Sequence, residues 1–140
     1  MYDLERFILA QERGYDRALL ELEAGRKMTH WIWYIFPQLE TLGYSERAKF
    51  FGISGIKEAR AYMKHPILGP RYLKCIAAII NHKGQPLEEI MGGDLDAKKL
   101  SSSLTLMLAA GGGSDVRETL DVFYGGQICE DTLRDLAKPQ

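Results

Sequence analysis

The sequence predicts an all-α fold: one compact single domain of about seven helices of unequal length that is not a simple up-down bundle. Three observations favour it. Apolar residues recur at spacings of three and four along several segments, which places them on one helix face. Most of the 14 glycines fall where these segments end. No segment alternates apolar and polar residues strongly enough for a strand, and no Asn-Gly or Asp-Gly hairpin signal occurs.

Length and composition fit one globular domain spanning residues 1–140. The chain is 46% apolar and 26% charged, so it can bury a core without disulfides or metals. Its net charge of −1 lacks the basic excess of most nucleic-acid binders, which predicts no nucleic-acid partner. Cys75 and Cys129 form no CxxC motif and fit a reducing compartment with free thiols.

No basic and apolar leader is visible at the start of the chain, and no apolar run approaches the roughly 20 residues of a membrane helix. We therefore expect a cytoplasmic protein with no membrane association. Whether it is a monomer or a homodimer stays open.

The longest helix is expected over residues 3–24, where apolar and aromatic positions share one face. Asp115 with Glu118 has the spacing of a capping box, which predicts a helix start there. The other expected helices span about 45–50, 55–64, Pro70 to near Gly84, 87–91, 94–110, 115–124 and a last short stretch from Asp131.

Residues 26–43 break the helical pattern. Five aromatic or imidazole side chains crowd into seven positions, and Pro37 disfavours helix at the residue before it. We expect a short helical turn over about 28–35 and then an extended loop to Gly43.

Two interpretations of the Arg26–Gln38 segment, RKMTHWIWYIFPQ, are open. Its aromatic side chains could anchor an irregular loop to the core. Together with Arg26, Lys27, His30 and Gln38, they could instead line a pocket for a flat or phosphorylated small molecule. His30 is the residue of this segment suited to proton transfer near neutral pH, so it is the candidate catalytic residue.

Other chemistry has weaker signals. The three histidines are far apart and no HxxxH or HExxH motif occurs, so we expect no metal site and no cofactor. The run 111–114 (GGGS) lacks the lysine of a P-loop, which favours a helix connector. The serines at 101–103 could cap or pack the helix, or their hydroxyls could contact a ligand beside a lysine.

Several segments share the pattern of a known family. They are Asp3-Leu4-x-Arg6-Phe7, Ala10-Gln11, Gly25-x-Lys27, His30-Trp31-x-Trp33-Tyr34-x-Phe36-Pro37-Gln38, Leu42-Gly43-x-Ser45, Glu58-Ala59-x-Ala61-Tyr62, His65-Pro66-x-Leu68-Gly69, Arg71, Asp96-x-x-Lys99-Leu100-x-Ser102-Ser103-Leu104-Thr105-Leu106 and Thr132-Leu133. On these residues the chain resembles the bacterial and fungal proteins grouped as domain of unknown function 1810 (DUF1810), some of which carry a calpastatin-like label.

The resemblance covers nearly the whole chain and implies an all-helical fold, but no established activity. The calpastatin label does not fit, because calpastatin acts through disordered segments and this chain has the composition of a folded domain. Met107 stands where the family usually has an aromatic residue, and Met91 where it favours phenylalanine. Both changes keep apolar bulk and are expected to alter packing rather than chemistry.

Two functions are therefore hypothesised. The first is a domain that binds a small anionic or nucleotide-like ligand, with catalysis left open. Its candidate residues are Arg26, Lys27, His30, Trp31, Trp33, Gln38, Lys99, Ser102 and Ser103. The second is a non-catalytic protein-interaction module that exposes the same aromatic patch.

Overall fold

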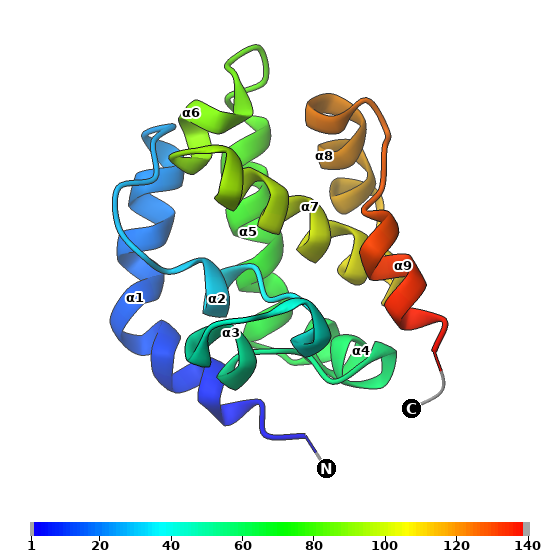
Figure 1. Ribbon diagram of the computed structural model, residues 1–140. Coiled ribbons are helices and arrows are strands. Elements are labelled where there is room, and N and C mark those ends of the chain that lie inside the picture. Colours follow the sequence, from blue (N-terminus) through cyan, green and yellow to red (C-terminus); the bar gives the residue numbers. More distant parts are fainter. Residues whose placement is uncertain (1, 139–140) are drawn as a thin grey trace.

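The computed structural model describes residues 2–138 and is all-helical over that range (Figure 1). Nine α-helices occur there, six of which have seven or more residues, so the prediction of an all-α fold is confirmed. The helices are α1 (Glu5–Glu23), α2 (Ile32–Ile35), α3 (Glu46–Phe50), α4 (Ile56–Lys64), α5 (Leu68–Ile80), α6 (Leu87–Met91), α7 (Asp94–Ala109), α8 (Ser114–Tyr124) and α9 (Glu130–Leu136), with a 3₁₀ turn η1 at Glu40–Leu42.

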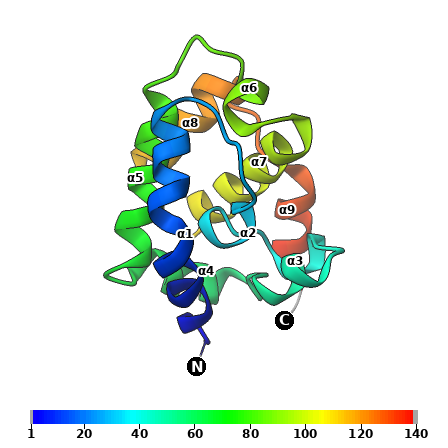
Figure 2. The ribbon, with the colours of Figure 1, turned by 90° about the vertical axis from the view of Figure 1, so that its left-hand side faces the viewer.

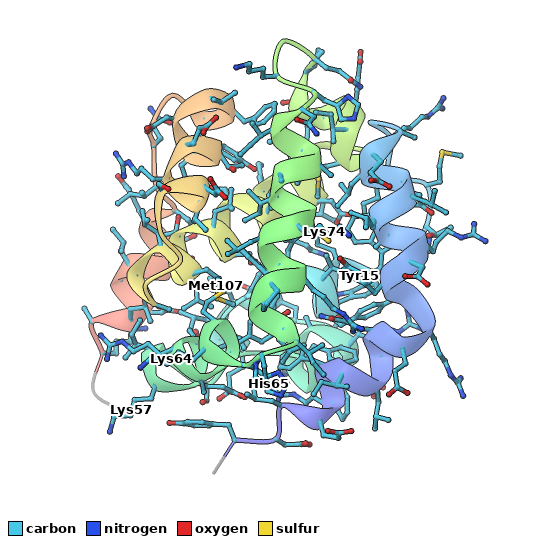
Figure 3. The ribbon with its side chains drawn as sticks, turned by 180° about the vertical axis from the view of Figure 1, so that it is seen from behind. Tyr15, Lys57, Lys64, His65, Lys74 and Met107 are labelled. Carbon is cyan, nitrogen blue, oxygen red and sulfur yellow. The ribbon has the colours of Figure 1, made fainter. Side chains whose placement is uncertain are left out.

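Helix α5 is the centre of the packing. It contacts α1, α4 and α8, while α7 crosses in front of it and contacts α4, α6, α8 and α9 (Figures 1 and 2). This crossing separates the fold from an up-down bundle, as the sequence predicted. Seen from behind, α5 lies nearest the viewer and the Arg26–Gln38 segment lies on the far side (Figure 3).

The helix periodicity explains the core. In α1 the residues Phe7, Ala18 and Leu22 are fully buried, and in α5 Cys75 and Ile79 are. These positions follow the three-and-four spacing of one helix face, which supplies the hydrophobic stabilisation. In the part of the chain that the structure describes, no helix has both the length and the apolar composition needed to cross a bilayer.

Helices α5, α8 and α9 begin one or two residues earlier than expected, and the start of α8 also differs in its capping. The prediction that Asp115 and Glu118 form a capping box is wrong, because α8 begins at Ser114 after Gly113 and has no side-chain cap. Gly113 has φ +88°, a conformation that favours glycine. The backbone geometry of the glycine run therefore sets the start of this helix.

Among residues 2–138, a single parallel bridge between Leu39 and Ile53 ties the loop before η1 to the loop before α4. The Ile53 N–H donates to the Gln38 carbonyl over 2.8 Å, and the Glu40 N–H donates to the Ile53 carbonyl over 2.9 Å. These bonds fix the backbone on both sides of Leu39. The backbone of Gln38, from which its side chain extends, is therefore held in place.

The close approach at Gly69 generates a stability prediction. A Cβ at this position would lie 2.2 Å from the Met63 carbonyl oxygen, and this backbone atom cannot swing aside. Gly69→Ala should lower the free energy of unfolding by roughly 2–3 kcal/mol, although alanine is the better helix former by about 1 kcal/mol. Urea unfolding followed by circular dichroism measures the change.

The matched control is Gly14→Ala in α1, where the added Cβ would meet the ring tip of Tyr34. That side chain can rotate away, so the loss should be clearly smaller. Equal losses for the two variants would contradict this account of Gly69.

Candidate functional site

The Arg26–Gln38 segment is held by one buried carboxylate, that of Glu21 on α1. Glu21 is 7% exposed and accepts four hydrogen bonds. The donors are the N–H groups of Met28 (2.7 Å) and Thr29 (3.0 Å), the Thr29 hydroxyl (2.7 Å) and the Trp31 indole N–H (3.0 Å). The irregular segment thus has its polar groups satisfied by α1 rather than by helix formation.

These hydrogen bonds also set the charge of Glu21. Burial alone would raise its pKa, but the bonds from Met28, Thr29 and Trp31 outweigh burial and lower the pKa to about 2 from the ordinary 4.5. The carboxylate is therefore ionised at neutral pH.

Lys27 is buried beside this anchor. Its side chain is 5% exposed, and its ammonium lies 2.8 Å from an Asp96 carboxylate oxygen. It also donates to the Thr29 carbonyl over 2.7 Å and lies 4.9 Å from the centre of the Trp31 ring. The Lys27 N–H donates to the Ile90 carbonyl of α6 over 2.7 Å, so this residue joins the segment to both α6 and α7.

A pocket of about 320 Å³ opens where the segment meets the start of α7, and we call it the His30 pocket. It is lined by Lys27, His30, Ile32, Trp33, Gly92, Gly93, Leu95, Asp96 and Lys99. Four of the residues singled out in the sequence meet here although Lys99 lies far along the chain from the other three. His30 itself is exposed.

The charges in the His30 pocket are unequally matched. Asp96 forms a close ion pair with Lys27 and a looser one with Lys99, at 3.9 Å. Two lysines thus share one carboxylate, which leaves an excess of positive charge. Lys99 is the cation held less tightly.

The ring of Trp33 makes cation–π contacts. Lys99 lies 5.5 Å and Arg47 5.2 Å from the Trp33 ring centre. Such contacts contribute about 0.5–1 kcal/mol at exposed sites. The buried Trp33 Nε1 is the one buried side-chain nitrogen or oxygen within residues 2–138 without a hydrogen-bond partner. Trp33 thus contacts two cations, Lys99 and Arg47, through the face of its ring.

A second pocket, the Gln38 pocket, adjoins the first and has a volume of about 440 Å³. Its lining residues are Gln38, Leu42, Gly43, Tyr44, Ser45, Ala48, Leu95, Lys98, Lys99, Ser102, Cys129 and Asp131. The two pockets share Leu95 and Lys99.

Sequence reasoning missed Asp96, although its three-residue spacing from Lys99 on a helix was a usable signal. It also missed Leu95 and Cys129, which carry no local signal of a site.

Three of the candidate residues lie outside both pockets. Trp31 is 1% exposed and its indole N–H is bonded to Glu21, so it anchors the segment. Ser103 is fully buried and bonded to the Tyr72 hydroxyl over 2.9 Å. Arg26 is exposed and lies in a different pocket with Glu88 and Glu89. We therefore leave these residues out of the proposed site.

Most of the aromatic surface that a protein-interaction module would use is buried in this fold. Trp31 and Phe36 are 1% and 0% exposed, and Trp33 and Tyr34 are partly buried. Within the segment Met28 is the strongly exposed apolar side chain, and nearby Tyr44 and Leu95 are exposed and line the Gln38 pocket.

Comparison with known proteins shows the family. The family model described as "protein of unknown function (DUF1810)" matches residues 1–136, so the chain belongs to this family. The crystal structure of the conserved hypothetical protein Rv1873 from Mycobacterium tuberculosis is 42% identical, covers 99% of each chain and has a TM-score of 0.95. The comparison with curated proteins gave no match. The fold is thus shared with a crystal structure, while the chemistry has to be inferred from the site.

The Glu21 anchor predicts a pH-dependent stability. Because its folded pKa lies below 4.5, Glu21 stabilises the fold above that value, and this contribution is lost as pH falls from 4.5 towards 2. Glu21→Gln should cost roughly 2–3 kcal/mol at pH 7, since it weakens the bonds to buried donors. The difference in unfolding free energy between wild type and Glu21→Gln should become smaller as pH falls from 7 to 3. Urea unfolding at each pH measures this difference.

Glu12→Gln is the control, because Glu12 is exposed on the same helix. It should change the unfolding free energy little at any pH. A wild-type-to-Glu21→Gln gap that stays constant from pH 7 to 3 would contradict the assignment.

The two cysteines should differ sharply in reactivity. Cys75 is fully buried, and burial raises the pKa of its thiol to about 12, whereas Cys129 is partly exposed in the Gln38 pocket. With a thiol reagent at pH 8, one thiol should react in the folded protein and two after unfolding in guanidinium. Cys129→Ser should abolish the native reaction. Persistence of that reaction in the variant would show that Cys75 is accessible.

Proposed function

We propose that this protein binds a small anionic ligand in the His30 pocket. The observation that carries the proposal is the convergence of Lys27, His30 and Lys99 on one concavity of about 320 Å³. Small-ligand sites are concavities with a few convergent polar groups. Both segments that form this one are packed against the core, so the cations are positioned before a ligand arrives.

Lys99 is the principal contact to the anion in this proposal. Its ammonium is only loosely paired with Asp96, at 3.9 Å, so a ligand oxygen can replace that contact at low cost. Lys27 is held by Asp96 and the Thr29 carbonyl, and contributes mainly its charge. Gly92 and Gly93 bring the backbone at the start of α7 into the lining, where the positive end of the helix dipole also favours an anion.

His30 supplies the chemistry that a simple anion site would not need. Its imidazole lies at the pocket wall, and no residue between 2 and 138 engages its ring in a hydrogen bond or ion pair. It is free to donate a hydrogen bond to the ligand. If the ligand is turned over, His30 is the group that transfers the proton.

The test uses inorganic phosphate and pyrophosphate as probes, with binding measured by isothermal titration calorimetry. Wild type should bind at least one of them, and Lys99→Met should weaken binding about tenfold, since one charge-assisted hydrogen bond is lost. His30→Ala should weaken binding by a factor of about three to ten for the same reason.

Lys74→Met is the matched control, because Lys74 is exposed on α5, on the face opposite the segment (Figure 3). It should bind like wild type. Equal affinities of wild type and Lys99→Met for every anion tested would sink the proposal.

A further inference from the structure

We infer that the ligand is a nucleoside monophosphate, with its phosphate in the His30 pocket and its base in the Gln38 pocket. This inference rests on the proposed anion site and extends it. Leu95 and Lys99 line both pockets, so the pockets adjoin at these two side chains, and we place one molecule across them. Their volumes of about 320 and 440 Å³ together fall in the roughly 300–1,000 Å³ range of small-ligand sites.

Gln38 offers a hydrogen-bonding edge in the second pocket. Its backbone is fixed by the bond from the Ile53 N–H, yet its partly buried side-chain amide has no partner among residues 2–138. An amide presents an acceptor and two donors in one plane. That pattern matches the edge of a nucleobase. Glutamine and asparagine side chains can form two hydrogen bonds to such an edge at once.

Ser102 supplies a second polar group. It is 3% exposed, lines the Gln38 pocket, and its hydroxyl lies 2.8 Å from that of Thr132. The pair has two hydroxyl protons and uses one between them. Within the described chain the other has no acceptor, so Ser102 can donate to the ligand while Thr132 donates to Ser102.

The rest of the Gln38 pocket suits the faces of a flat ring. Leu42, Ala48, Leu95 and Cys129 contribute apolar or sulfur surface. Tyr44, which is 94% exposed, lies at the rim, where its ring can stack on a bound base. An aliphatic acid would fill the apolar space but leave the Gln38 amide and the Ser102 hydroxyl without partners. A base satisfies both.

The experiment compares three probe classes on the intact protein: inorganic phosphate, the four nucleosides, and AMP, GMP, CMP and UMP. At least one monophosphate should bind about 100-fold tighter than phosphate or its own nucleoside, because the second contact is made intramolecularly. Gln38→Leu should weaken that monophosphate about tenfold and leave phosphate binding unchanged. Gln127→Leu, at an exposed glutamine, is the matched control and should change neither.

Alkylation of Cys129 gives a second readout that needs no variant. Cys129 lines the Gln38 pocket and not the His30 pocket, so the monophosphate should slow its reaction and phosphate alone should not.

The outcomes separate the two proposals. If phosphate binds through Lys99 while no monophosphate binds tighter than phosphate, or Gln38→Leu has no effect and Cys129 is not protected, the nucleotide inference is overturned and the anion site stands. If neither phosphate nor any monophosphate depends on Lys99, both fail.

Discussion

The carboxylate of Glu21 is the constraint on which the site depends. Without it, the N–H groups of Met28 and Thr29 and the buried indole N–H of Trp31 would lose their acceptor. Leaving a buried donor such as the indole unpaired costs about 1–3 kcal/mol. One ionised side chain replaces the hydrogen bonds that a helix would have provided. This lets the chain run irregularly past α7 and place Lys27, His30 and Trp33 along its start.

The aromatic residues follow from the same arrangement. A loop with few backbone hydrogen bonds needs large buried side chains to hold it, and Trp31 and Phe36 serve that purpose. Trp31 then also lies against the Lys27 ammonium, and Trp33 against that of Lys99. The two interpretations of the sequence motif therefore apply to different residues: Trp31 anchors, and Trp33 faces the pocket. Anchoring of the loop and positioning of the cations are one structural feature.

Helix periodicity was enough to predict the fold class and most helix bounds, because burial of one face decides them. The site could be predicted only in part. Ser102 and Ser103 are neighbours in sequence, but consecutive helix residues point about 100° apart, so Ser102 reaches a pocket and Ser103 the core. In the segment itself neither helical nor strand periodicity applies. The sequence therefore could not tell that Trp31 is buried and that Trp33 faces the pocket. Leu95 and Cys129 come together only through the crossing of α7 and α9.

Asp96 pairs unequally with the two lysines of the His30 pocket, and this inequality bears on the ligand binding that we propose there. A lysine as buried as Lys27 requires a counter-ion, and Asp96 provides one at 2.8 Å. The same carboxylate reaches Lys99 only at 3.9 Å, where the side chain remains 24% exposed. In the site that we propose, an incoming anion would therefore compete for Lys99 and not for Lys27, because displacing Asp96 from Lys27 would break the closer pair, in which the lysine side chain is 5% exposed. The unequal sharing of one aspartate between two lysines is the reason that we propose Lys99, and not Lys27, as the main contact to the ligand.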